Sequence, residues 1–218
     1  MSKLQIIIGS TRPNRAADKV APWVIDRAKS HKAFDVEVLD LRDWPLPIFA
    51  ENFDTIGDIN DPTYSHPVVK RWNQKIKEAD AYLVITPEYN HSVPGVLKNA
   101  IDSVWISFAF RNKPIVAVGY SGGIAGGVRA IEHLAQIAIE AELVPIRAAV
   151  VIPRVAEAFD GGLPVNPVTD ISLEVALDDL AWWSAALEPA RAAGELVPAA
   201  FRVQAAAAAL NEVEDEVV

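Results

Sequence analysis

The sequence contains no cysteine, which excludes disulfide bonds, thiolate metal sites and cysteine nucleophiles. Its four histidines form no HxH or HxxxH spacing, so we expect no metal site. No apolar run approaches the ~20 residues that a membrane-spanning helix needs. The first residues do not resemble a signal peptide, and we therefore expect a cytoplasmic protein that has no membrane partner.

Positive charge is also scarce. The chain has 20 lysines and arginines against 29 acidic residues, a formal net charge of -9. Nonspecific binding to nucleic acid depends on surplus positive charge, so we expect no nucleic-acid partner. The balance remains compatible with a locally positive pocket for one phosphate.

Short apolar runs alternate along the chain with segments of helical periodicity, a pattern typical of βαβ units and a parallel sheet. We predict strands over 4–8, 36–39, 81–85, 114–119 and 148–152. We predict helices over 17–29, 68–78, 93–104, 128–142 and 171–193, the last with Asp170 as its cap. Five strands in one such run predict an α/β fold, a flavodoxin-like three-layer sandwich with strand order 2-1-3-4-5.

Two segments stand apart from this pattern. Asp40–His66 is long and rich in proline, and connections of this length are often functional. Residues 1–193 read as the flavodoxin-like domain, whereas residues 194–218 form an alanine-rich and acidic C-terminal extension. A helix over Ala199–Asn211 would pack on a partner subunit, or the extension would be a frayed acidic end.

The segment Thr86–Asp102 organises the chain. It follows a buried apolar strand and begins with a polar, aromatic loop that contains Glu88, Tyr89 and Asn90, stiffened by the preceding Pro87. Open α/β sheets bind their ligands at such strand ends. Position alone leaves a second interpretation, in which the loop only connects two elements and Tyr89 covers the edge of the core.

The loop Gly9–Arg15 follows the first strand. It offers a glycine for a tight turn, the hydroxyl of Ser10, and the arginines Arg12 and Arg15 at the mouth of a helix. Backbone N–H groups and the positive helix end favour an anion there. The loop matches neither the Walker motif nor GxGxxG, so a phosphate monoester is favoured over a plain capped turn.

A third unusual loop, Tyr120–Gly123, follows the fourth predicted strand and offers the hydroxyl of Ser121 and close backbone approach at Gly122. In the predicted strand order the three loops meet at one edge of the sheet. A phosphate end, a polar middle and a place for a flat ring describe flavin mononucleotide (FMN) better than a sugar or an amino acid.

One competing interpretation is a serine hydrolase, because Gly119–Gly123 matches the G-x-S-x-G nucleophile elbow. In that fold an acidic residue and then a histidine follow the serine. The one histidine after Ser121 is His133, inside the next predicted helix. The motif match is therefore judged accidental.

Taken together, Gly9–Arg15, Pro87–Asp102 and Tyr120–Gly123 resemble the NAD(P)H-dependent FMN reductase family of flavin, quinone, azo-dye and chromate reductases. The resemblance implies an FMN enzyme with a ping-pong hydride mechanism. It would carry electrons from NADPH or NADH to a small-molecule acceptor, namely a quinone, an azo dye, a metal oxyanion or free flavin. The alternative is a flavin-binding electron carrier or redox sensor without nicotinamide turnover.

The resemblance also implies roles for individual residues, none of them catalytic, because the flavin itself carries the chemistry. Gly9, Ser10, Arg12 and Arg15 would hold the phosphate. Pro87, Glu88, Tyr89 and Asn90 would contact the ring and the ribityl chain, and Ser121 and Gly122 the pyrimidine side. Asn14 stands where glycine is common in the family, and asparagine tolerates the left-handed conformation.

Members of this family are commonly homodimers or homotetramers, and we expect the same here. The candidate contact surface is the long Asp40–His66 connection with Trp105, Phe108 and Phe110. Packing in the protein's own core is the alternative for Trp105.

Overall fold

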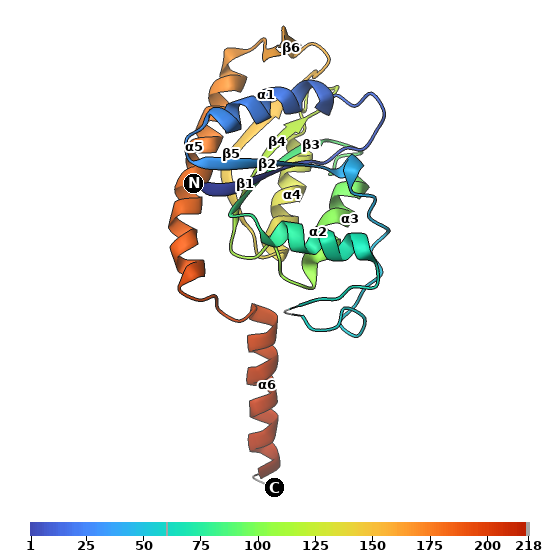
Figure 1. Cartoon of the computed structure of the whole chain (residues 1–218), viewed down its shortest axis with the longest axis vertical. Helices are drawn as coiled ribbons and strands as arrows, with labels where there is room; N and C mark the ends of the chain where they lie inside the picture. The colour runs from blue at the N-terminus through green and yellow to red at the C-terminus, as the bar shows by residue number, and fades with distance from the viewer. Residues whose placement is uncertain (60, 217–218) are drawn as a thin grey trace. The chain divides into compact units, whose positions relative to one another are not determined.

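The computed structural model describes residues 1–59 and 61–216, and its central sheet confirms the predicted strand order. All five strands run parallel in the order β2-β1-β3-β4-β5 (Figure 1). The strands are β1 (Ser2–Ile8), β2 (Phe34–Asp40), β3 (Ala81–Pro87), β4 (Pro114–Tyr120) and β5 (Val144–Ile152). This is the flavodoxin-like order.

The strand register brings the three unusual loops to one edge of the sheet. Ile8 at the end of β1 pairs with Ile85 of β3, and Pro87 at the end of β3 pairs with Tyr120 at the end of β4. The loops that follow β1, β3 and β4 therefore leave the sheet side by side at its carboxyl edge.

Helices cover both faces of the sheet, which makes the predicted three-layer sandwich. The helices are α1 (Ala17–Ser30), α2 (Pro67–Lys77), α3 (Gly95–Trp105), α4 (Val128–Glu140) and α5 (Pro167–Ala192). Alternate residues of β1 explain the two cores: Leu4 and Ile6 pack with α1 and α5, whereas Ile7 packs with α2, α3 and α4. All residues of β3 are buried, as expected of a strand covered on both faces.

Most predicted boundaries lie within two residues of the observed ones, but two were wrong by four residues. β5 begins at Val144 instead of residue 148, and α5 begins at Pro167 instead of residue 171. Asp170 consequently lies inside the first turn of α5 and does not cap it. Its carboxylate pairs with Arg27 at 2.8 Å and accepts a hydrogen bond from the indole of Trp23 at 2.7 Å, which ties α5 to α1.

The long connection after β2 is ordered by contacts with its neighbours. It begins with a single 3-10 turn, η1 (Leu41–Asp43), and then packs the ring of Trp44 edge-on against Trp72 of α2, with 4.9 Å between ring centroids. The amide of Asn99 on α3 donates to the carbonyl of Pro47 and accepts from the N–H of Phe49, both at 2.8 Å. A second short sheet pairs β6 (Phe159–Asp160) with β7 (Leu163–Pro164).

The predicted subunit contact needs one correction. Phe110 is only 2% exposed and meets Tyr82 edge-on within the protein's own core, with 5.1 Å between ring centroids. It is therefore not available to a partner. Trp105 and Phe108 are half-buried, and their role in a subunit contact stays a prediction.

The chain divides into a compact unit of residues 1–188 and a second unit from Pro189 onward. The second unit contains the end of α5 and the helix α6 (Ala199–Glu216), which confirms the helix predicted over 199–211 and extends it. Whether 194–218 acts as a separate extension stays a prediction, and its last two residues lie outside the described ones. Within the described part of the chain, no helix combines the length and apolar character that crossing a bilayer would require.

Candidate functional site

A cavity of about 290 Å³ lies where the loops after β1, β3 and β4 meet. Seven of the predicted site residues line it, and they come from all three loops. The lining includes Arg12, Arg15, Pro87, Glu88, Tyr89, Ser121 and Gly122, together with Asn14, Tyr120 and Val155. The prediction that three loops separated in sequence build one site is consistent with this arrangement.

Gly9 sits at the base of the first loop, and its expected role in a tight turn was wrong. A β-carbon on Gly9 would lie 2.9 Å from Cδ2 of Leu97 and 3.2 Å from the carbonyl oxygen of Ile85. Glycine is needed because the loop passes close to α3 and β3, so lack of space and not backbone conformation selects it. Asn14 does adopt the left-handed conformation, with φ 51°.

Tyr89 joins the first loop to the second. Its hydroxyl lies 2.8 Å from the hydroxyl of Ser10, which is fully buried beneath it. The guanidinium of Arg12 lies over the Tyr89 ring, 5.3 Å from its centroid, in cation–π geometry. Arg12 is exposed. It is therefore the cation of this loop that a ligand meets first.

Arg15 is buried and mainly engaged with its own protein. Its guanidinium makes an ion pair with both carboxylate oxygens of Asp40, donates to Asp18 at 2.9 Å, and donates to the carbonyl of Ser10. This cluster fastens the first loop to the end of β2. Burial alone would raise the pKa of Asp40, but the hydrogen bonds from Arg15 and from the N–H of Arg42, together with the charges of these two arginines, lower that pKa below its ordinary value.

A second arginine, Arg42 of η1, supports the same loop from outside. It donates to the carbonyl of Arg12 and lies 3.4 Å from the carboxylate of Asp18. No local sequence pattern indicates Asp18, Asp40 or Arg42 as site residues, because their partners lie in other elements.

Glu88 lines the cavity, but its side chain turns toward α4. The carboxylate is 4% exposed, forms an ion pair with the guanidinium of Arg129, and accepts the Arg129 backbone N–H at 3.2 Å. Burial opposes the charged form, yet the hydrogen bond from Arg129 lowers the pKa of Glu88, which is ionised at neutral pH. Its contact with a ligand would therefore come from its backbone.

Asn90 and His91 form a tight turn between Tyr89 and Ser92. Both have positive φ, 50° and 67°, and Tyr89 and Ser92 exchange two backbone hydrogen bonds of 2.9 and 3.1 Å. Positive φ at both central positions is the mark of a two-residue type I′ turn, and asparagine and histidine are among the non-glycine residues that adopt positive φ most often. Asn90 is exposed at the tip of this turn.

Ser121 shapes the third loop. Its hydroxyl accepts the N–H of Gly126 at 2.9 Å and donates to the carbonyl of Gly123 at 3.2 Å. His133, the histidine that the hydrolase interpretation would need, instead lies 3.0 Å from the hydroxyl of Ser92. This geometry gives no support to a serine nucleophile.

The sequence did not single out Tyr120 as a site residue. Its hydroxyl is buried and makes no hydrogen bond of good geometry within residues 1–59 and 61–216, although Ser10 and the backbone of Ala17 lie near enough to favour its charged form. Burial raises the pKa of Tyr120, with the nearby Tyr89 adding to the effect, so the hydroxyl stays protonated and able to donate. Its place as the last residue of a buried strand, directly before Ser121, was the one available signal.

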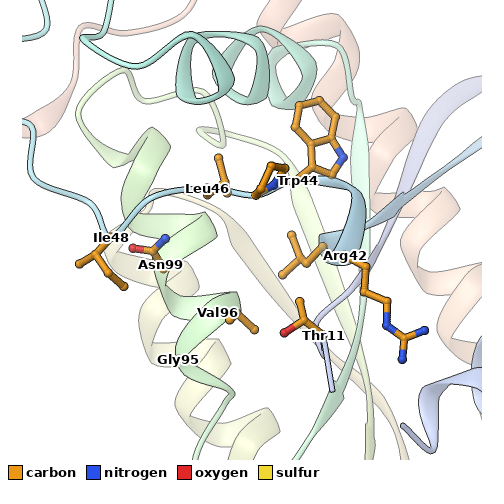
Figure 2. Close-up of a pocket in the computed structure, with 10 residues that line it drawn as sticks. Thr11, Arg42, Trp44, Leu46, Ile48, Gly95, Val96 and Asn99 are labelled. Carbon is orange, nitrogen blue, oxygen red and sulfur yellow. The ribbon is translucent and has the colours of Figure 1, made fainter. Parts of the chain in front are cut away.

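A larger cavity of about 570 Å³ lies on the other side of the first loop. Figure 2 shows Thr11 and Val96 facing each other across its lower part, with Trp44 and Leu46 above them and the guanidinium of Arg42 pointing away. Its walls are mainly apolar. We place the candidate site in the smaller cavity, because the three loops converge there.

Comparisons with known proteins point the same way. The family described as NADPH-dependent FMN reductase matches residues 2–157. An NAD(P)H-dependent FMN reductase of Schizosaccharomyces pombe is 36% identical over 154 residues, covering 70% of this chain and 74% of that protein. A quinone reductase of Pseudomonas putida is 30% identical over 182 residues, covering 82% of this chain and 92% of that protein.

Solved structures agree with these sequence matches. The flavoenzyme NAD(P)H:(acceptor) oxidoreductase of Paracoccus denitrificans superposes with a TM-score of 0.68 at 25% identity, covering 86% of this chain and 99% of that one. A flavodoxin, WrbA-like protein of Agrobacterium tumefaciens, at 12% identity and a TM-score of 0.52, shares the fold. Because the family match spans well over half of its residues, this chain belongs to the NADPH-dependent FMN reductase family.

Proposed function

We propose that the protein binds FMN in the cavity between the three loops and uses it to pass electrons from NAD(P)H to a small-molecule acceptor. One observation carries the proposal. The loops after β1, β3 and β4 surround a single cavity. The first loop places the exposed cation Arg12 there, and the other two loops offer backbone N–H and C=O groups. The family implies both FMN and NAD(P)H.

The first loop fits a phosphate group. Arg12 supplies an exposed guanidinium, and α1 begins at Ala17, so the positive end of the helix lies beside the loop. Tyr120 also lines the cavity, although its hydroxyl is buried. Ser10 is covered by Tyr89, and we infer that it acts mainly by holding the Tyr89 hydroxyl in place.

The second and third loops fit a flat ring with polar edges. Pro87, Glu88 and Tyr89 line the cavity through a rigid segment, and Ser121 and Gly122 line it from the third loop. A flavin bound there would accept hydride and pass electrons on, so the chain needs only to bind it, orient it and limit its contact with water. No acid or base is assigned for this reason.

The nicotinamide and the acceptor would use the same cleft in turn, in a ping-pong cycle. We favour a quinone as acceptor, because the Pseudomonas putida relative with which this chain aligns over 82% of its length is named a quinone reductase. Free flavin, azo dyes and metal oxyanions complete the panel of acceptors to be compared.

The proposal is tested on the full chain. Calorimetric titration should show FMN binding, and anaerobic mixing of the complex with NADPH or NADH should bleach the flavin absorbance, which benzoquinone then restores. Bound flavin that neither nucleotide bleaches would favour the electron carrier. A protein that takes up no FMN would overturn the proposal.

Replacing Arg12 with alanine is expected to weaken FMN binding. A hydrogen bond to a charged group is worth about 1.5–3 kcal/mol, which corresponds to a loss of roughly 10- to 100-fold in affinity. Calorimetric titration at fixed salt measures the effect. Lys29→Ala, which removes an exposed charge from the opposite end of α1, should leave the affinity unchanged. Equal FMN affinities for both variants would show that Arg12 does not contact the phosphate group.

A further inference from the structure

The Glu88–Ser92 turn places two successive residues, Asn90 and His91, in the left-handed region of backbone conformation. That region is sparsely populated for residues other than glycine, and such backbone persists where surrounding contacts hold it. The turn also carries part of the cavity lining, since Glu88 and Tyr89 contribute to it. Whatever holds the turn therefore shapes the cavity.

Helix α4 supplies that support at three points. Arg129 in its first turn pairs with the carboxylate of Glu88 and donates from Nη1 to Nε2 of His91 at 2.9 Å. His133, four residues along the same helix face, lies within 3.0 Å of the hydroxyl of Ser92. Arg129 therefore contacts Glu88 and His91 through its charged group, and His133 contacts Ser92 at the end of the turn.

The electrostatics explain why Arg129 dominates. Glu88 is a buried carboxylate, and it accepts from both the guanidinium and the backbone N–H of Arg129 at the amino end of α4. Helix amino ends favour anions, so Glu88 fills the place that an external anion would otherwise occupy. A neutral His91 ring must accept from Arg129, because a guanidinium has no acceptor to offer.

We propose that Arg129 is a positioning residue for the cofactor. It acts through Glu88 and His91 and fixes the conformation of residues 88–92. In this way it determines the affinity of the cavity for FMN and the surroundings of the bound flavin. This inference rests on the proposed function, because it assumes that FMN occupies this cavity.

The test compares Arg129→Ala, Arg129→Lys and the double variant Glu88→Gln/Arg129→Gln, which leaves no unpaired buried charge. FMN affinity, the visible spectrum of the bound flavin and hydrogen exchange of residues 88–92 in the flavin-free full chain are the readouts. At metal sites, loss of a group that orients a ligand residue typically costs about 10- to 100-fold in affinity, and we expect a loss of about tenfold in FMN affinity for Arg129→Ala by analogy. Faster exchange at 88–92 and a shifted flavin spectrum should accompany it.

Arg129→Lys should restore part of the affinity, since one ammonium group can pair with Glu88 but cannot also serve His91 in the same geometry. The double variant should lose no more affinity than Arg129→Ala, because both changes break the same linkage. Arg147→Ala removes an exposed charge from β5 and should match the wild type in all three readouts.

The outcomes separate the two proposals. A wild type that takes up no FMN overturns the proposed function, whatever the variants do. A wild type that binds FMN, with wild-type affinity, spectrum and exchange in Arg129→Ala, overturns the role of Arg129 alone. If Arg129→Ala fails to fold, the double variant decides. Wild-type affinity, spectrum and exchange in the double variant overturn the role of Arg129, whereas weaker FMN binding with faster exchange at residues 88–92 supports it.

Discussion

Replacing Gly127 with alanine is expected to destabilise the protein by about 3–5 kcal/mol, at the upper end of single-site effects. Gly127 precedes α4 with φ 93° and ψ 5°, a conformation that other residues rarely adopt. A β-carbon there would lie 2.6 Å from the carbonyl carbon of Gly119 and closer still to the amide nitrogen of Tyr120. These are backbone atoms of β4 and cannot rotate away.

The same change should also damage the site. Relief of the clash has to shift either the end of β4, which carries Tyr120 and is followed by Ser121, or the start of α4, which carries Arg129. Urea unfolding gives the loss of stability, and flavin titration gives the loss of binding. Gly123→Ala is the matched control, because a β-carbon at Gly123 meets no heavy atom within 4 Å. Similar urea midpoints for the two variants would contradict the close approach at Gly127.

The second large effect is expected from Asp40→Asn. This change keeps the size of the side chain but removes the charge that faces the buried guanidinium of Arg15, whose side chain is 4% exposed. Removal of one partner from a buried ion pair costs up to about 3–5 kcal/mol. We expect a loss of about 2–3 kcal/mol at pH 7, because Asp18 still pairs with Arg15.

The loss should depend on pH in a defined direction. The pKa of Asp40 is lowered in the folded protein, because hydrogen bonds from Arg15 and the N–H of Arg42 and the charges of both arginines together exceed the opposing effect of burial. A lowered pKa contributes stability above the unfolded-state value, about 3.9, and this stability disappears as the pH falls through the folded-state value. The difference between wild type and Asp40→Asn should therefore shrink as the pH is lowered below about 4.

Urea unfolding at pH 7, 5 and 3.5 measures this difference. Asp35→Asn, an exposed position on the same strand, should stay within about 0.5 kcal/mol of the wild type at each pH. A gap between wild type and Asp40→Asn that is constant across the three pH values would show that the ionised form of Asp40 does not stabilise the fold.

The strand order and the meeting of the three loops could be predicted, because both follow from local patterns. Apolar runs of strand length alternate with helical periodicity, and the order of a doubly wound sheet then places the ends of β1, β3 and β4 side by side. Element starts were less predictable. The amino end of β5 and the first turn of α5 carry no local signal strong enough to extend them to Val144 and Pro167.

The orientation of individual side chains in the site was not predictable. Glu88 and Arg15 were both expected to face a ligand, yet each is engaged by a partner from a distant part of the chain. Arg15 meets Asp40, 25 residues away, and the N–H of Arg129 meets Glu88 across 41 residues. Such partners become neighbours only when parallel strands bring their ends together.

By itself the sequence determined the α/β class, the strand order, the three loops that meet at one edge of the sheet, and the family to which the chain belongs. These features rest on residue type and spacing, which act within a few residues of the chain. Three features depend on the tertiary structure alone. A β-carbon at Gly9 would clash with neighbouring segments, and Phe110 is buried in the core. Arg129 forms an ion pair with Glu88 of the Glu88–Ser92 turn. Burial, close approach and charge pairing depend on which distant segments the sheet brings together, and no local pattern records that.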